Sequence, residues 1–96
     1  MRKESIPVDL DIVNDIIKEL FNKKDVIRTS DIIRQYCGGF YSNKGISAFR
    51  SFNAQFGKLL KRNEEFLGIH EVRAGVSEKD DLDHPTTTSE WEGSVS

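Results

Sequence analysis

The sequence predicts one mainly α-helical domain, with three helices and a small β-hairpin at its C-terminal end. Three observations support this fold class. Two amphipathic segments have the period of an α-helix, a short capped segment lies between them, and the pattern changes to alternation after residue 65. A chain of 96 residues is long enough for one domain with a core of modest size.

The first helix is predicted over residues 9–24. Asp9 and Asp11 lie in its first turn and Lys23 and Lys24 in its last turn, where these charges complement the helix dipole. Apolar residues follow the i, i+3, i+4, i+7 spacing that places them on one face, at Leu10, Val13, Ile16, Ile17, Leu20 and Phe21.

The second helix is predicted to begin at the capping sequence Thr29-Ser30-Asp31 and to end before Gly38-Gly39, because glycine accepts the left-handed conformation at a helix end. Its buried side is expected to carry Ile32, Ile33, Tyr36 and Cys37. The preceding residues 26–28 suit either an extended link or a minimal strand.

The third helix is predicted from an N-cap at Ser47 to about Arg62, after a linker over residues 40–46. Its apolar face occupies about a quarter-turn at ~100° per residue, and it consists of Phe49, Phe52, Phe56, Leu59 and Leu60. The opposite face carries Ser47, Arg50, Ser51, Ala54, Lys58 and Lys61.

A strand is predicted over residues 66–73, followed by a polar, acidic loop over 74–85 in which Asp80, Asp81 and Asp83 form a solvated run. Residues 86–92 suit a return strand or a flexible tail. Trp91 favours the strand, because a lone large aromatic side chain usually packs on something. The domain therefore divides into a core over 1–76 and an acidic loop with its return strand or tail over 77–96.

Basic residues are sorted along the chain. Residues 32–62 contain six Lys or Arg and no Asp or Glu, although the whole chain has a net charge of −2. Residues 1–76 hold 13 Lys or Arg against 10 Asp or Glu, a net +3, and residues 77–96 hold one Lys against six acids, a net −5. Separating the charges in this way does not stabilise the fold, but it favours binding to a polyanion, because Lys and Arg release counterions from the phosphates. The pattern indicates a DNA-binding module.

The predicted DNA contacts combine cations for phosphates with small or amide side chains that let a helix enter the major groove. A solvated helix face is the alternative for the cations, and ordinary helix positions are the alternative for the small and amide residues. The predicted contact residues are Arg34, Lys44, Ser47, Arg50, Ser51, Ala54, Gln55, Lys58, Lys61 and Arg62.

The order of these elements resembles that of a winged helix-turn-helix domain. Residues 29–38 resemble the first helix of the pair and residues 47–61 a recognition helix, and the run NAQFGKLLK at 53–61 is similar to segments of phage and plasmid replication proteins. The resemblance implies three helices plus a wing, and a transcription regulator or a replication accessory factor of a phage or mobile element. Two departures are a long linker before the third helix and an acidic loop where a wing is usually basic.

No enzymatic site, metal site or cofactor is expected. Cys37, His70 and His84 lack metal-ligand spacing, and no Gly-rich phosphate loop follows a strand. No apolar run approaches the roughly 18–20 residues of a membrane helix, so a cytoplasmic protein without a membrane partner is expected.

The expected partner is double-stranded DNA, bound by one chain, a homodimer or a larger protein assembly. The alternative is a protein-interaction module with a winged fold, of the phage inhibitor or adaptor type. The acidic stretch over residues 78–92 would suit a basic protein surface.

Overall fold

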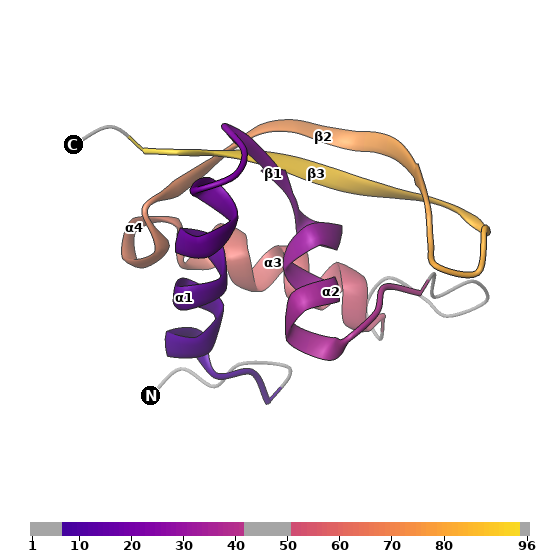
Figure 1. The fold of residues 1–96 in the computed structure, drawn as a ribbon, viewed down its shortest axis with the longest axis horizontal. Coiled ribbons are helices and arrows are strands. Elements are labelled where there is room, and N and C mark those ends of the chain that lie inside the picture. The colour runs from indigo at the N-terminus through magenta and orange to yellow at the C-terminus, as the bar shows by residue number, and fades with distance from the viewer. Residues whose placement is uncertain (1–6, 42–50, 95–96) are drawn as a thin grey trace.

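A computed structural model describes residues 7–41 and 51–94, which form an α+β fold (Figure 1). Helices make up 46% and strands 29% of the described residues, so the prediction of a mainly α fold is wrong. The elements are α1 (Leu10–Phe21), β1 (Val26–Arg28), α2 (Thr29–Cys37), α3 (Phe52–Arg62), α4 (Glu64–Leu67), β2 (Ile69–Lys79) and β3 (Pro85–Gly93).

The three strands form one antiparallel sheet in the order β1-β3-β2, with the helices on one side of it (Figure 1). β3 is central, and Trp91 on β3 pairs with Ile27 of β1 and with Glu71 of β2. β1 pairs only with residues 90–92, so residues 85–88 of β3 pair with β2 alone. The hairpin of β2 and β3 therefore extends beyond β1 as a two-stranded arm.

The arm is longer than the sequence predicts, because β2 continues through residues 74–79 and only residues 80–84 form the connecting loop. This part of β2 is polar and mostly exposed, so it lacks the apolar alternation by which strands are identified. The pairing register shifts twice between Glu71 and Val76, and Gly75 has a φ of 66° in this irregular stretch. Such bulges bend a hairpin and increase its twist.

The core lies between the helices and the sheet. Its buried apolar side chains come from every helix and every strand, and they are Val13, Ile17, Leu20, Ile27, Ile32, Ile33, Phe40, Phe56, Leu59, Leu60, Leu67, Ile69 and Trp91. The Trp91 indole Nε1 donates a hydrogen bond of 2.8 Å to Thr29 Oγ1. The backbone N–H of Ser30 donates to Thr88 Oγ1 at 3.1 Å, so the first turn of α2 is fixed to β3 at two points.

Several helix boundaries differ from the prediction. α1 ends at Phe21, so Lys23 and Lys24 lie beyond it, and α2 begins at Thr29 after the N-cap Arg28.

Ser51 is extended, with φ −70° and ψ 128°, and its hydroxyl accepts a hydrogen bond from the N–H of Ala54, so it caps α3, which begins at Phe52. The predicted cap Ser47 lies outside the described residues. Residues 64–67 form α4, which ends at Gly68 with φ 67°, so the strand begins at Ile69 and not at residue 66.

Cys37 differs from the prediction as well. It is exposed at the last position of α2, although the apolar spacing of that helix places it on the buried side. The helix ends at Gly38, which is left-handed with φ 85°, so Cys37 lies in the final turn directly before the chain changes direction.

Removal of the Trp91 side chain tests how far the fold depends on β3. Trp91 is only 1% exposed, and we expect Trp91→Ala to lower the free energy of unfolding by about 3–5 kcal/mol, as for other buried large-to-small changes. Urea denaturation followed by circular dichroism measures the loss. The control Val72→Thr keeps β-branching at a position that is 43% exposed, and it should cost less than about 0.5 kcal/mol. Equal losses of unfolding free energy in the two variants would show that the fold does not depend on the Trp91 side chain.

Candidate nucleic-acid interface

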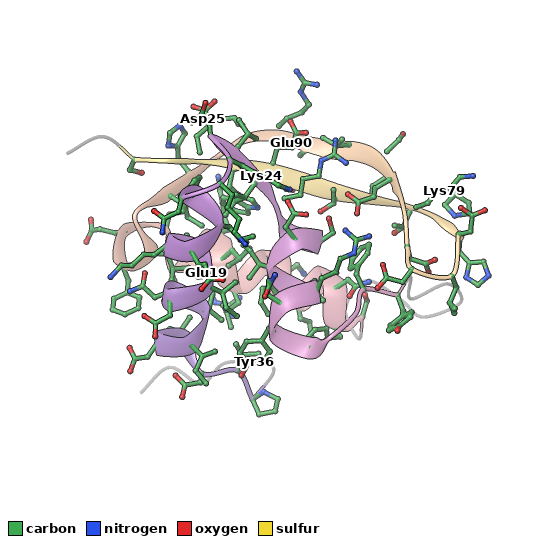
Figure 2. The ribbon with its side chains drawn as sticks, viewed as in Figure 1. Glu19, Lys24, Asp25, Tyr36, Lys79 and Glu90 are labelled. Carbon is green, nitrogen blue, oxygen red and sulfur yellow. The ribbon has the colours of Figure 1, made fainter. Side chains whose placement is uncertain are left out.

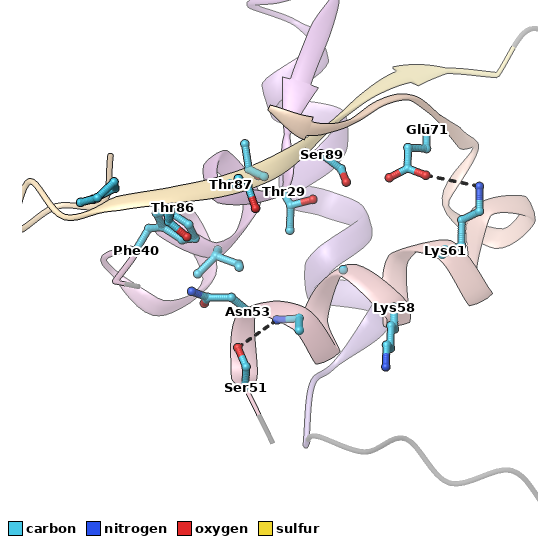
Figure 3. A pocket seen from close by; sticks show the side chains of 16 residues that line it. Thr29, Phe40, Ser51, Asn53, Lys58, Lys61, Glu71, Thr86, Thr87 and Ser89 are labelled. Atoms are coloured by element: carbon cyan, nitrogen blue, oxygen red, sulfur yellow. Dashed lines mark hydrogen bonds and ion pairs between the residues drawn. The ribbon is translucent and has the colours of Figure 1, made fainter. Parts of the chain in front are cut away.

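A groove of about 770 Å³ separates α3 from the arm of the sheet (Figure 3). Its floor is the exposed face of α3, where Ala54 and Gly57 have little or no side chain. A Cβ atom placed on Gly57 would meet nothing within 4 Å among its neighbours. The groove is therefore open above the helix axis, and a partner could approach the α3 backbone closely.

The opposite wall of the groove is the first half of β3, a run of hydroxyl side chains from Thr86 to Ser89. Figure 3 shows Thr87 and Ser89 on the strand above α3, whereas the Lys58 side chain extends from the helix away from that strand. Hydroxyls are neutral groups that both donate and accept hydrogen bonds. The wall is thus polar and uncharged where it faces the helix.

Two of the predicted contact cations, Lys58 and Lys61, line this groove. Lys58 is exposed and has no ion pair within residues 7–41 and 51–94. Lys61 Nζ lies 3.4 Å from Glu64 Oε2 and 3.6 Å from Glu71 Oε1, so its charge is partly balanced. Arg62 follows on the same helix and is exposed.

The remaining predicted contact residues have different positions. Ala54 lines the groove, and Gln55 is half-buried beside it on α3. Ser51 also lines the groove, but it is buried and its hydroxyl caps α3. Outside the described residues lie Lys44, Ser47 and Arg50.

Arg34 lies in a separate cluster of ion pairs and does not line the groove. Its Nη1 is 2.9 Å from Glu78 Oε2, and its Nε donates to Asp81 Oδ1 at 2.9 Å. Arg28 reaches the other oxygen of Glu78 at 3.0 Å and also contacts Glu90. The cluster lies where β1 leads into α2, near the labelled Lys24 and Glu90 in Figure 2. Arg34 therefore holds the arm against α2.

Two acids of the connecting loop, Asp80 and Asp81, hold its backbone in place through hydrogen bonds, a role that the sequence did not reveal. Asp80 is 5% exposed, and its Oδ1 accepts hydrogen bonds from the N–H groups of Leu82 and His84. Asp81 exchanges two hydrogen bonds with the backbone of Phe40, each of 2.9 Å. The prediction of a solvated acidic run is therefore wrong for Asp80, which is buried because the loop folds back on its carboxylate. Asp81 is exposed, although its carboxylate binds the Phe40 N–H and Arg34. The signal available was an aspartate at the start of a tight turn.

In residues 7–41 and 51–94, no three His, Cys, Asp or Glu side chains gather closely enough to hold a metal ion. None of the helices in these ranges has the length and apolar content needed to cross a lipid bilayer. Comparison with protein-family models, curated proteins and solved structures found no match.

The Asp81 contacts predict a dependence of stability on pH. The hydrogen bond from the Phe40 N–H, followed by that from Arg34, lowers the pKa of the Asp81 carboxyl in the folded state. The unfolded chain then binds the proton more tightly, so this contribution is complete above about pH 4 and is lost as the pH falls through the folded pKa.

We expect Asp81→Asn to remove this part of the pH dependence, as measured by urea denaturation between about pH 2 and pH 6. The control Asp83→Asn changes an exposed carboxylate in the same loop. Curves of identical shape for the wild type and Asp81→Asn would contradict the assignment.

Proposed function

We propose that the protein binds double-stranded DNA without catalysing a reaction, through the exposed face of α3. The observation that carries this proposal is Lys58, a cation without an ion-pair partner in the described residues, in a groove that also contains Lys61. Glu71 is the only acid among the described lining residues. Ammonium groups beside a helix with a small-residue face suit the phosphates and groove of a duplex.

The resemblance of residues 29–38 and 53–61 to winged helix-turn-helix domains motivates the same function. On this basis the protein is a small cytoplasmic regulator or a replication accessory factor. A homodimer would double the number of phosphate contacts, because each chain would present its own α3.

A protein partner is the second candidate, and Leu82 favours it. This side chain is 62% exposed in the loop of the arm, next to the exposed carboxylate of Asp83. An apolar side chain beside an acid suits a basic protein surface. A gel shift with random-sequence duplex at low salt discriminates between the candidates, since absence of a shift would exclude DNA binding and favour the protein partner.

Lys58→Ala should weaken duplex binding and reduce its salt dependence. If Lys58 contacts one phosphate, its loss should make the slope of log K against log[salt] shallower by about 0.9. Fluorescence anisotropy with a labelled duplex at several salt concentrations measures both quantities.

Lys18→Ala is the matched control, because Lys18 is exposed on α1 and does not line the groove. We expect its slope to change less than that of Lys58→Ala. An unchanged slope for Lys58→Ala would exclude the phosphate contact.

Glu71→Gln should tighten duplex binding. The Glu71 carboxylate faces Lys61 across 3.6 Å and competes with phosphate for that ammonium group. Loss of this partly exposed ion pair would free the Lys61 ammonium group for phosphate, and the affinity for duplex should rise by about 1.5- to 5-fold at low salt.

Glu65→Gln is the control, because it removes the same single negative charge from an exposed residue of α4. The same anisotropy assay compares the two variants. Equal tightening in both would indicate a general charge effect and no competition at Lys61.

A further inference from the structure

We infer that Thr87 and Ser89 on β3 donate hydrogen bonds to phosphate oxygens of the DNA strand that Lys58 contacts. The arm would then meet the DNA through its stem, and its acidic loop would remain off the phosphates. This inference rests on the proposed function and adds a second wall to the contact surface.

The two hydroxyls belong to the less buried positions of this part of β3. Thr87 is exposed and Ser89 is half-buried, whereas Thr88 between them is buried and accepts a hydrogen bond from Ser30 of α2. Both residues line the groove, and Figure 3 shows them above α3.

Neighbouring hydroxyls are already occupied, but these two are not. Thr88 Oγ1 accepts from the N–H of Ser30, and Thr29 Oγ1 accepts from Trp91 Nε1. Thr87 and Ser89 have no hydrogen-bond partner for their hydroxyls within residues 7–41 and 51–94. Their hydroxyls, like that of Thr86, therefore remain available to a ligand.

The chemistry of the groove fits a phosphodiester backbone. A phosphate oxygen is an anionic acceptor, and the O–H donors of Thr87 and Ser89 could bind one such oxygen. The ammonium group of Lys58, which extends from α3 away from the strand, could bind another phosphate of the same DNA strand. The one acid among the described lining residues, Glu71, is paired with Lys61. The small side chain of Ala54 leaves room for a bulky sugar–phosphate chain between the walls.

The connecting loop has the opposite character. It carries the carboxylates of Asp81 and Asp83, and the former is already bound to Phe40 and Arg34. No residue from 80 to 84 is among the described residues that line the groove. Like charge would repel phosphate from the loop, so contact by the stem is favoured.

The test compares Thr87→Val and Ser89→Ala with the wild-type protein, using anisotropy of a fluorescein-labelled random-sequence duplex at several salt concentrations. Each loss of a hydrogen bond to the anionic phosphate should weaken binding by roughly 12- to 160-fold. A neutral donor releases no counterion, so the salt slope should stay at the wild-type value. This separates the hydroxyls from Lys58, whose removal changes the slope.

Two control variants test a hydroxyl outside the groove and a residue of the connecting loop. Ser77→Ala removes an exposed hydroxyl from the strand position paired with Thr87, outside the groove. Leu82→Ala changes the loop, and it should leave affinity unchanged. Urea denaturation of each variant shows whether any loss reflects unfolding.

Weaker binding by folded Thr87→Val and Ser89→Ala at constant slope supports the inference. Wild-type affinity in both variants, with binding still weakened by Lys58→Ala, overturns the stem contact and leaves the proposed function intact. A loss of affinity in Leu82→Ala alone also overturns it, in favour of a loop contact. Failure of the wild-type protein to bind duplex overturns the inference and the proposed function together.

Discussion

The burial of Trp91 is the constraint on which the rest of the structure depends. Trp91 lies in the central strand, between Ile27 of β1 and Glu71 of β2, and its indole N–H is bound to Thr29 at the start of α2. One side chain thus connects all three strands to a helix. Because β1 is only three residues long, it contributes few pairs of its own. The packing of Trp91 therefore fixes where the arm leaves the sheet.

Glu78 fixes the direction of the arm. Its side chain, only 10% exposed, accepts a hydrogen bond from the Ser30 hydroxyl at 2.8 Å and pairs with Arg28 and Arg34. A carboxylate in so enclosed a position needs several donors to offset its lost hydration. These donors come from β1 and α2, so the arm can satisfy Glu78 only while it lies against α2. The width of the groove over α3 follows from that position.

The sequence predicted what local periodicity determines. The apolar residues Val13, Ile17 and Leu20 of α1, and Phe56, Leu59 and Leu60 of α3, are buried as the helical spacing requires. The polar half of β2 was not predictable in this way, because its pairing with β3 and its ion pairs decide its conformation. The contact of Arg34 with Asp81 spans 47 residues and leaves no local signal. Lys58 and Lys61 in the groove were predictable from the face of α3, but its hydroxyl wall was not, since it depends on the arm.

Folding also redistributes the charges of the linear sequence. Arg34 belongs to the basic run over residues 32–62, yet it is neutralised by Glu78 and Asp81 from the acidic end of the chain. Glu78 and Asp81 are thus held against Arg34 of α2, and neither lines the groove. Lys61 alone among the described lysines of α3 meets acids, at Glu64 and Glu71, and Lys58 meets none. A basic run therefore overstates the charge available to a polyanion, and the cations left without acids are the better guide to where it would bind.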